Sequence, residues 1–409
     1  MSATEIIKSD PTAAPGRLAT LAATILEHAY NAREALGAAR YSKADALWIS
    51  GREKTTGETV RTFYFGSQRS LDHIIDRLYD EHSVERRESK LRAWTVNRHV
   101  RLAQASADLL IVDLPWPYSR FVREQGFIRV PGWVIQEVKL PAAWDDVVAG
   151  FRKNTRTTDL RKIRKFKLSY RLTNDLQEID RFYESMYAPY AVHRFGKLVA
   201  LGSREEIARA AKRGALLQVM EGKRAVAGVI VMPRRLTMHF LWFGLPLDLE
   251  EPIADAALSG LYYFSLQHAH RQKCAELHLS YTLPLLNDGV YRYKRKWGAR
   301  IREGWDLEEI LLRPMHLKPS LSGFFANQPL IARENKQLVG RILLTAPVTA
   351  EDVEKVLDSY VSPGLQRMDL YSLCKIDPAI RAAKFGDDVV TRLIDLSTER
   401  DPLAVFTKR

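Results

Sequence analysis

The chain has 409 residues, of which 46% are hydrophobic and 27% are charged, and its formal net charge is +13. This length exceeds one ordinary hydrophobic core and predicts two or three domains. The composition excludes a disordered or fibrous protein, and no apolar run approaches the ~20 residues that span a bilayer. The positive charge favours anionic partners, such as nucleic acid, nucleotide-linked substrates or an acidic membrane surface, without choosing among them.

Two features indicate the compartment. Cys274 and Cys374 provide no disulfide framework, which favours a reducing environment. The first residues contain no continuous apolar core of the kind that a signal peptide has. We therefore expect a cytoplasmic protein.

The first third of the chain predicts an α/β unit after an N-terminal tail and helix at 1–37. Apolar periodicity and β-branched runs place its elements as follows: strands at 44–50 and 60–66, a helix at 69–80, and buried strands at 108–114 and 133–140. We interpret 38–140 as a first α/β half.

The second predicted unit spans 141–315 and contains an apolar stripe, a basic run and helices at 174–190 and 204–213. Its most compact stretch, 214–299, predicts a hairpin, a strand at 236–244, a helix that begins near Pro252, a strand at 275–281 and a closing loop at 282–300. Residues 313–330 contain three prolines and predict a surface linker. The remainder of 316–409 predicts a small α/β appendage with strands at 340–345 and 366–374 and helices at 351–360 and 387–396.

The closing loop carries the most informative motif. Residues 287–298 read NDGVYRYKRKWG after a short strand, and this segment resembles the GNAT acyltransferase superfamily, more narrowly its Fem-like branch, which includes FemAB-related and CelD-like proteins. Residues 182–196 are similar to the substrate-side helix of that branch. The resemblance covers about 141–305. It implies an α/β (α+β) fold with a GNAT-like mixed central sheet flanked by helices, and two GNAT-like halves, the first degenerate, followed by the appendage.

The resemblance also implies a function. It predicts an N-acyltransferase or aminoacyltransferase that moves an activated acyl group to an amine of a cell-envelope or polysaccharide-related precursor by direct attack. The donor would be acyl-CoA or aminoacyl-tRNA, with no tightly bound cofactor. The expected partners are an anionic small-molecule or lipid-linked substrate, tRNA and a peripheral membrane surface, and the sequence leaves the oligomeric state open.

One part of the GNAT pattern differs here. The acetyl-CoA enzymes place a glycine-rich loop before the central helix, where backbone amides hold pyrophosphate. In this chain Glu250, Glu251 and Asp255 surround the helix start and would repel that anion. We expect acetyl-CoA to bind poorly in the usual pose.

Lys294 is the leading catalytic candidate in the closing loop. At the boundary of a strand and a loop its ammonium group can hold a phosphate or stabilise an oxyanion. Tyr291 and Tyr293 belong either to the core or to an acceptor pocket. Asp288 precedes Gly289 and suits a turn, although its carboxylate is also placed to take a proton from an attacking amine.

Other candidates flank this loop. His239 lies in mid-strand, opposite the packed side chains, and is either structural or a general base. The segment that resembles the substrate-side helix contains four further candidates, which either bind the acceptor or pack against the first half: Tyr187, Tyr190, His193 and Arg194.

The basic run supplies the candidate anion contacts Arg156, Arg161 and Lys165. The run extends from Arg152 to Arg171 with a single acid, so it is either a solvated helix face or a surface for diphosphate or tRNA-like backbone. A binding protein that keeps the fold and uses this basic face for nucleic acid or an anionic membrane is therefore the alternative function.

A metal site is not expected. His268, His270, Cys274 and His278 invite a zinc interpretation, but only His270 and Cys274 share a helical face and no CxxC or HExxH pattern accompanies them.

Overall fold

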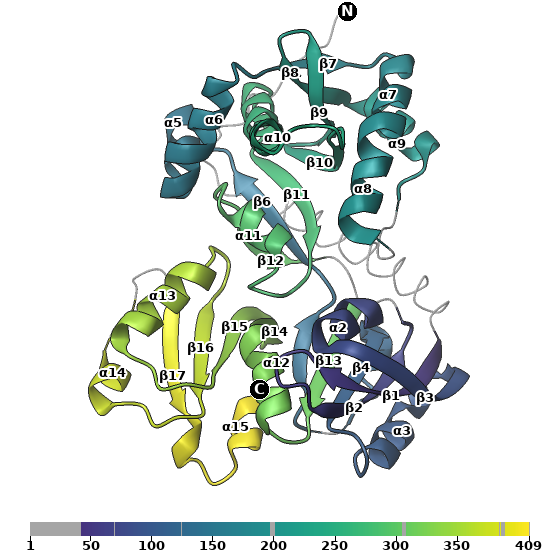
Figure 1. The fold of residues 1–409 in the computed structure, drawn as a ribbon, viewed down its shortest axis with the longest axis vertical. Coiled ribbons are helices and arrows are strands. Elements are labelled where there is room, and N and C mark those ends of the chain that lie inside the picture. The colour runs from purple at the N-terminus through teal and green to yellow at the C-terminus, as the bar shows by residue number, and fades with distance from the viewer. Residues whose placement is uncertain are drawn as a thin grey trace, which may run out of the picture.

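The computed structural model describes residues 42–408 apart from positions 69, 124, 197–200, 305–307, 384 and 386–388. The helix predicted within 1–37 lies outside the described residues. The described chain forms three sheets with helices packed on them (Figure 1). In this part of the chain no helix is long and apolar enough to cross a membrane.

The first sheet belongs mainly to the N-terminal third. Its strands lie in the order β3 (Tyr79–Arg92), β1 (Lys43–Glu53), β2 (Thr59–Gly66), β4 (Leu109–Pro115), β13 (Glu308–Pro314) and β5 (Ile128–Pro131). Strands β2 and β4 are parallel and the other neighbours are antiparallel. Successive side chains point to opposite faces. Tyr64 therefore packs with α2 (Leu71–Leu78), whereas Phe63 and Phe65 pack with α3 (Val96–Ala103).

The second sheet contains the hairpin, strand, helix and strand that the sequence predicts. Its order is β12 (Arg300–Glu303), β6 (Val134–Lys139), β11 (Glu276–Thr282), β10 (Thr237–Gly244), β9 (Arg224–Arg234), β8 (Ala215–Glu221) and β7 (Ser169–Thr173). Strands β10 and β11 are parallel and the other neighbours are antiparallel. A parallel neighbour requires a crossover, which α10 (Glu251–Arg271) provides.

Helices cover both faces of the second sheet. Leu217 and Val219 of β8 face a core that includes α10, α5 (Trp144–Ala149) and α6 (Leu160–Lys165). Leu216, which precedes Leu217 in the strand, faces the opposite core. That core is formed by α7 (Leu176–Phe182), a π-helical turn at Tyr183–Tyr187, α8 (Ala188–Phe195) and α9 (Arg204–Arg213). The predicted mixed sheet flanked by helices is confirmed.

The third sheet is formed by the C-terminal part. Its strands lie in the order β14 (Leu330–Glu334), β15 (Gln337–Leu344), β16 (Arg367–Ser372) and β17 (Val390–Asp395), with α13 (Ala350–Tyr360), α14 (Pro378–Ala382) and α15 (Pro402–Thr407) in the connections and at the end. Strands β15, β16 and β17 are parallel. The predicted C-terminal α/β appendage is present.

The chain passes between the first two sheets twice, and the first passage contacts the start of β13. After β5 it continues through Gly132 into β6 of the second sheet, and after β12 it returns to β13 of the first. The Gly132 N–H donates to the carbonyl of Glu308 (2.9 Å), and a Cβ at Gly132 would lie 2.6 Å from that residue's Cβ. Strand β6, within the predicted unit 38–140, thus belongs to the second sheet, and β13, within the predicted unit 141–315, belongs to the first. The apolar pattern of a strand does not specify the sheet that it joins.

Three local predictions are wrong. Residues 313–330 are not a surface linker, because they form the end of β13 and the helix α12 (Pro319–Asn327), which buries Leu321, Phe324 and Phe325. The predicted helix at 387–396 is strand β17 where the structure describes it, since β-branched residues favour the strand. The closing loop contains the helix α11 (Gly289–Arg295).

The burial of α12 leads to a stability prediction. Phe325 is 2% exposed and its ring lies 5.3 Å from that of Phe406. We expect Phe325→Ala to lower the free energy of unfolding by about 3–5 kcal/mol, because the cavity adds to the lost transfer energy. The control Leu236→Ala, at a side chain that is 67% exposed, is expected to change it by less than ~0.5 kcal/mol. Equally small shifts of the two urea-unfolding curves would contradict the core assignment.

Candidate functional site

The central feature of the second sheet is a gap between its two parallel strands. Strands β10 and β11 pair at Thr237–Glu276, Met238–Leu277 and His239–His278, and the pairing then ends. The register of each strand with its other neighbour is also irregular just beyond this point, between Phe240 and Phe243 and between His278 and Tyr281. The carboxyl ends of the two strands therefore separate, and their backbones are not joined by ladder bonds there.

Ser280 fixes the width of this gap. Its backbone has a positive φ of 64°, a conformation that non-glycine residues rarely adopt. Its N–H donates to Nδ1 of His278 (3.1 Å), and its hydroxyl donates across the gap to the carbonyl of Phe240 (2.8 Å). Such local strain is found at functional sites when the surrounding contacts impose it.

A cavity of about 170 Å³ occupies the gap. Its lining comes from five elements: Phe240, Leu241 and Phe243 of β10, Leu279, Ser280 and Tyr281 of β11, Leu258 and Tyr262 of α10, Val290, Tyr293 and Lys294 of α11, and Arg194 of α8. The cavity is mostly apolar and contains a few convergent polar groups, as ligand sites do.

Lys294 is the buried cation of this cavity. Its side chain is 4% exposed, and its ammonium nitrogen donates to the carbonyls of Tyr281 (3.0 Å) and Ser280 (3.5 Å). Burial lowers the pKa of Lys294 to about 7, which the carboxylate of Asp288 opposes. Lys294 thus lies in a helix that approaches the ends of β11, rather than in the predicted loop.

Asp288 creates that helix. Its carboxylate accepts from the N–H groups of Val290 and Tyr291 (3.0 Å each) and so caps α11. The same carboxylate forms an ion pair with Arg77 of α2 (3.0 Å). It is not among the residues that line the cavity, and its contacts are those of a helix cap.

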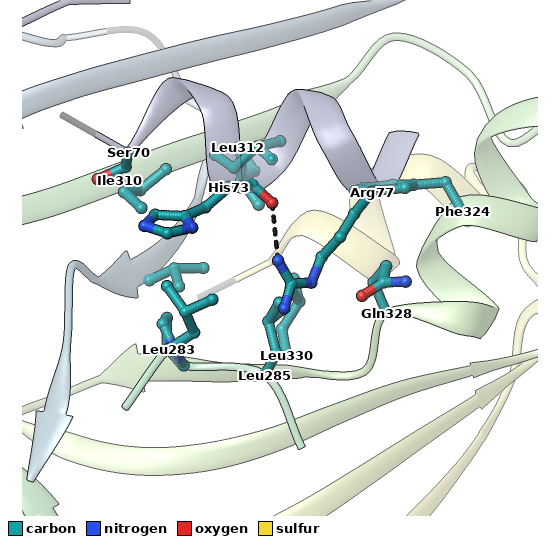
Figure 2. A pocket seen from close by; sticks show the side chains of 13 residues that line it. Ser70, His73, Arg77, Leu283, Leu285, Ile310, Leu312, Phe324, Gln328 and Leu330 are labelled. Carbon is teal, nitrogen blue, oxygen red and sulfur yellow. Dashed lines mark hydrogen bonds between the residues drawn. The ribbon is translucent and has the colours of Figure 1, made fainter. Parts of the chain in front are cut away.

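Arg77 joins α11 to a second, apolar pocket, which Figure 2 shows. Its guanidinium donates to the carbonyl of His73 (3.0 Å) as well as to Asp288. The pocket behind it is lined mainly by Ile74, Val130, Leu283, Leu285, Ile310, Leu312 and Leu330. Sequence reasoning missed Arg77, because 211 residues separate it from Asp288 and nothing local signals the pair.

The two tyrosines of the motif have different surroundings. Tyr293 lines the cavity, and its hydroxyl lies 3.3 Å from that of Ser259 on α10. Tyr291 is fully buried in a core shared with the third sheet, where burial raises its pKa to about 12. The helix explains the difference, because neighbours two positions apart point in different directions.

Of the four residues on the predicted acceptor side, Arg194 reaches the cavity. It donates to the Tyr190 hydroxyl (3.2 Å), and the ring of Tyr190 packs on Phe243 at 5.7 Å. Tyr187 is buried and its hydroxyl accepts from the N–H of Gly202 (2.9 Å), which is a structural contact. His193 is exposed and does not line the cavity.

His239 does not line the cavity either. Its ring lies 4.8 Å from that of His278, in a polar row that continues through Glu137 of β6. Burial lowers the pKa of both rings, that of His278 to about 4. Glu137 is held by Arg300 and Arg302, each at 2.7 Å. Met238 and Phe240 belong to the core on the α10 side, so alternation places His239 on the other face.

The basic run lies beside the start of α10. Lys162 forms an ion pair with Asp255 (3.1 Å), and Asp159 of the run pairs with Lys296, the residue directly after α11 (3.1 Å). The predicted contacts Arg156, Arg161 and Lys165 are exposed, and none of them lines the cavity. The structure therefore brings together Lys294, Tyr293, Arg194 and Tyr190, and leaves these three cations on the outer surface.

Comparisons with solved structures found similarities at low sequence identity. The chain is similar to FemX (11% identity, TM-score 0.36, covering 66% of this chain and 84% of that one) and to L-PGS from Bacillus licheniformis (11%, 0.34, 67% and 86%). It is also similar to a GCN5-related N-acetyltransferase from Sphaerobacter thermophilus (12% identity, TM-score 0.29, covering 63% of this chain and 76% of that one). No protein-family model and no curated protein matches the sequence.

The lowered pKa of Lys294 predicts a pH-dependent stability. Between pH 7 and 9 the unfolded chain keeps this proton and the native protein loses it, so native stability rises with pH. Relative to the variant Lys294→Met, the parent should gain roughly 1 kcal/mol per pH unit, or ~2 kcal/mol between pH 7 and pH 9. Urea unfolding of both proteins at pH 7 and pH 9 measures this difference. A difference that stays constant would mean that Lys294 remains charged in the native protein.

Proposed function

We propose that this chain is an acyltransferase or aminoacyltransferase in which an acceptor amine attacks an activated acyl group directly. The observation that carries the proposal is Lys294, a buried amine with a pKa of about 7 in a mostly apolar cavity between two separated parallel strands. A group that is half neutral at pH 7 can both accept and return a proton at that pH.

The reaction needs no covalent enzyme intermediate. The amine adds to the carbonyl of a thioester or ester and forms a tetrahedral intermediate, while neutral Lys294 accepts a proton from the nitrogen. The carbon–sulfur or carbon–oxygen bond then breaks, and the protonated Lys294 returns that proton to the leaving group. The charged form also lies where it stabilises developing negative charge, at a mostly apolar cavity.

The surrounding residues supply orientation. Arg194 lines the cavity and its guanidinium donates to the hydroxyl of Tyr190, an arrangement that suits an acceptor with an anionic or hydroxylated group. Tyr262 and Phe243 supply apolar surface for the acyl group. We propose that the acceptor is an amine of a cell-envelope or polysaccharide-related precursor, a class to which the resemblance of the motif points.

The acids at the start of α10 bear on the donor. Glu250 and Glu251 stand where a pyrophosphate would need free amides and positive potential, and Asp255 is paired with Lys162. This arrangement favours an aminoacyl ester over acetyl-CoA as the donor.

Replacement of Lys294 tests the proposal. We expect Lys294→Ala to lower kcat/KM by about 10²–10⁴, the range that general acid–base catalysis supplies. The matched control is Arg292→Ala, an exposed cation on the same helix, which should retain activity within about threefold. Transfer is measured with radiolabelled aminoacyl-tRNA and acyl-CoA as alternative donors. Equal turnover of the two variants would remove Lys294 from the chemistry.

A second candidate function is the binding of polyanions without catalysis. The exposure of Arg156, Arg161 and Lys165 outside the cavity favours it, because exposed cations in a run suit a general electrostatic face.

A substitution series separates the two functions. If the run is a polyanion face, each change of Arg156, Arg161 or Lys165 to Gln should weaken tRNA binding by a similar step and reduce the salt slope by ~1. If the run holds one substrate of defined shape, Arg156→Gln and Arg161→Gln should dominate and raise KM. Binding and transfer measured at two salt concentrations decide between these outcomes, and Lys336→Gln, far along the chain, serves as the neutralisation control.

A further inference from the structure

The outer helix of the first sheet presents a surface that the proposed reaction does not use. Helix α3 buries Val96, Val100 and Ala103 against the sheet. Its opposite side carries Trp94, in the 3-10 turn that leads into α3, and Leu102, which are 48% and 64% exposed. Figure 1 shows α3 at the outer lower right, in a different unit from α10 and α11.

The turn after α4 (Trp116–Ser119) extends this surface. The Asn97 side-chain amide donates to the carbonyl of Phe121, and the N–H of Arg123 donates to the Asn97 side-chain oxygen (2.9 Å). These bonds fix Phe121, which is 42% exposed, beside α3. Three large apolar side chains that face solvent thus lie on two adjoining segments.

Arginines accompany the apolar side chains. The exposed ones on these segments are Arg92, Arg98, Arg101, Arg120 and Arg123. The guanidinium of Arg92 lies 5.3 Å from the ring of Trp94. The neighbouring acid Glu88 is already engaged by Arg86 and His99. We name this set, together with Trp94, Leu102 and Phe121, the α3 patch.

We propose that the α3 patch docks the protein on a bilayer that contains anionic phospholipid. An amphipathic helix with arginines beside tryptophan and leucine suits the interface, because the apolar side chains enter the headgroup boundary while the guanidinium groups meet phosphates. The long arginine stems reach the headgroups from the helix surface. Leu102 is the most exposed of the three apolar side chains, and an aliphatic side chain neither pairs with phosphate nor stacks on bases. The combination of leucine, aromatic rings and arginines therefore favours a bilayer over nucleic acid.

Helix α3 is short, so binding to the bilayer depends on both the arginines and the apolar side chains of the α3 patch. Each arginine near an anionic surface contributes about fivefold to the partition coefficient. Three partly inserted apolar side chains contribute a further ~10-fold or more. We therefore expect reversible docking that requires anionic lipid and weakens with salt.

The test uses the full chain and vesicles of phosphatidylcholine with or without 30% phosphatidylglycerol (about one anionic lipid in three). Flotation should recover the parent with the mixed vesicles only. Arg98→Glu with Arg123→Glu should lower the partition coefficient more than ~20-fold. Leu102→Ser with Phe121→Ser, which changes no charge, should lower it ~10-fold. The matched control is Arg235→Glu with Lys336→Glu, which reverses the same number of charges at exposed positions outside both the α3 patch and the basic run and should cost less than ~3-fold.

Three results would overturn the proposal. One is the absence of binding that depends on phosphatidylglycerol. Another is an equal loss in the patch and control variants, which would indicate net charge alone. The third is a patch variant that loses tRNA binding and keeps vesicle binding, which would make the surface a nucleic-acid face. Unchanged thermal unfolding shows that a patch variant is folded. Unchanged transfer to a water-soluble acceptor shows that the α3 patch takes no part in the transfer reaction.

Discussion

The separation of β10 and β11 after His239 and His278 is the constraint on which the site depends. A continuous ladder would leave no space between these strands for a ligand. The hydroxyl of Ser280 bridges the gap to the carbonyl of Phe240, and the irregular registers beyond it keep the carboxyl ends apart. Helix α10 connects the two strands over one face, and α11 brings Lys294 to the opening. The cavity is therefore a consequence of topology and of one strained residue.

Helix α11 connects all three units. Asp288 at its start is paired with Arg77 of the first unit. Near its end Arg295, 6% exposed, donates to the carbonyls of Val361 (2.9 Å) and Asp358 (3.0 Å) of the third unit. Lys294 lies between these anchors and points to the carbonyls of Ser280 and Tyr281. The C-terminal unit thus contributes to holding the candidate catalytic lysine, a role that its own sequence does not indicate.

The sequence predicts those features that depend on local pattern. Alternation in 236–244 assigned the faces of β10, and the motif at 287–298 pointed to Lys294. Local pattern failed where the surroundings decide the structure. The prolines near α12 suggested a linker, although Pro319 begins a helix that buries Phe324 and Phe325. Asp288 and Gly289 suggested a turn, although the aspartate caps a helix. Arg77 and Ser280 were not found at all, since one acts across 211 residues and the other through its backbone conformation.

The most direct measurement of the central claim is the pKa of Lys294 in the native protein. A protein labelled with ¹³C at the lysine Cε positions, titrated by NMR, reports each ammonium group separately. Burial in the cavity predicts one resonance that titrates near pH 7, is absent from Lys294→Met, and shifts when an acceptor amine or an acyl-donor analogue is added. If every lysine resonance titrates near pH 10, Lys294 is a solvated cation and the proposed site is wrong.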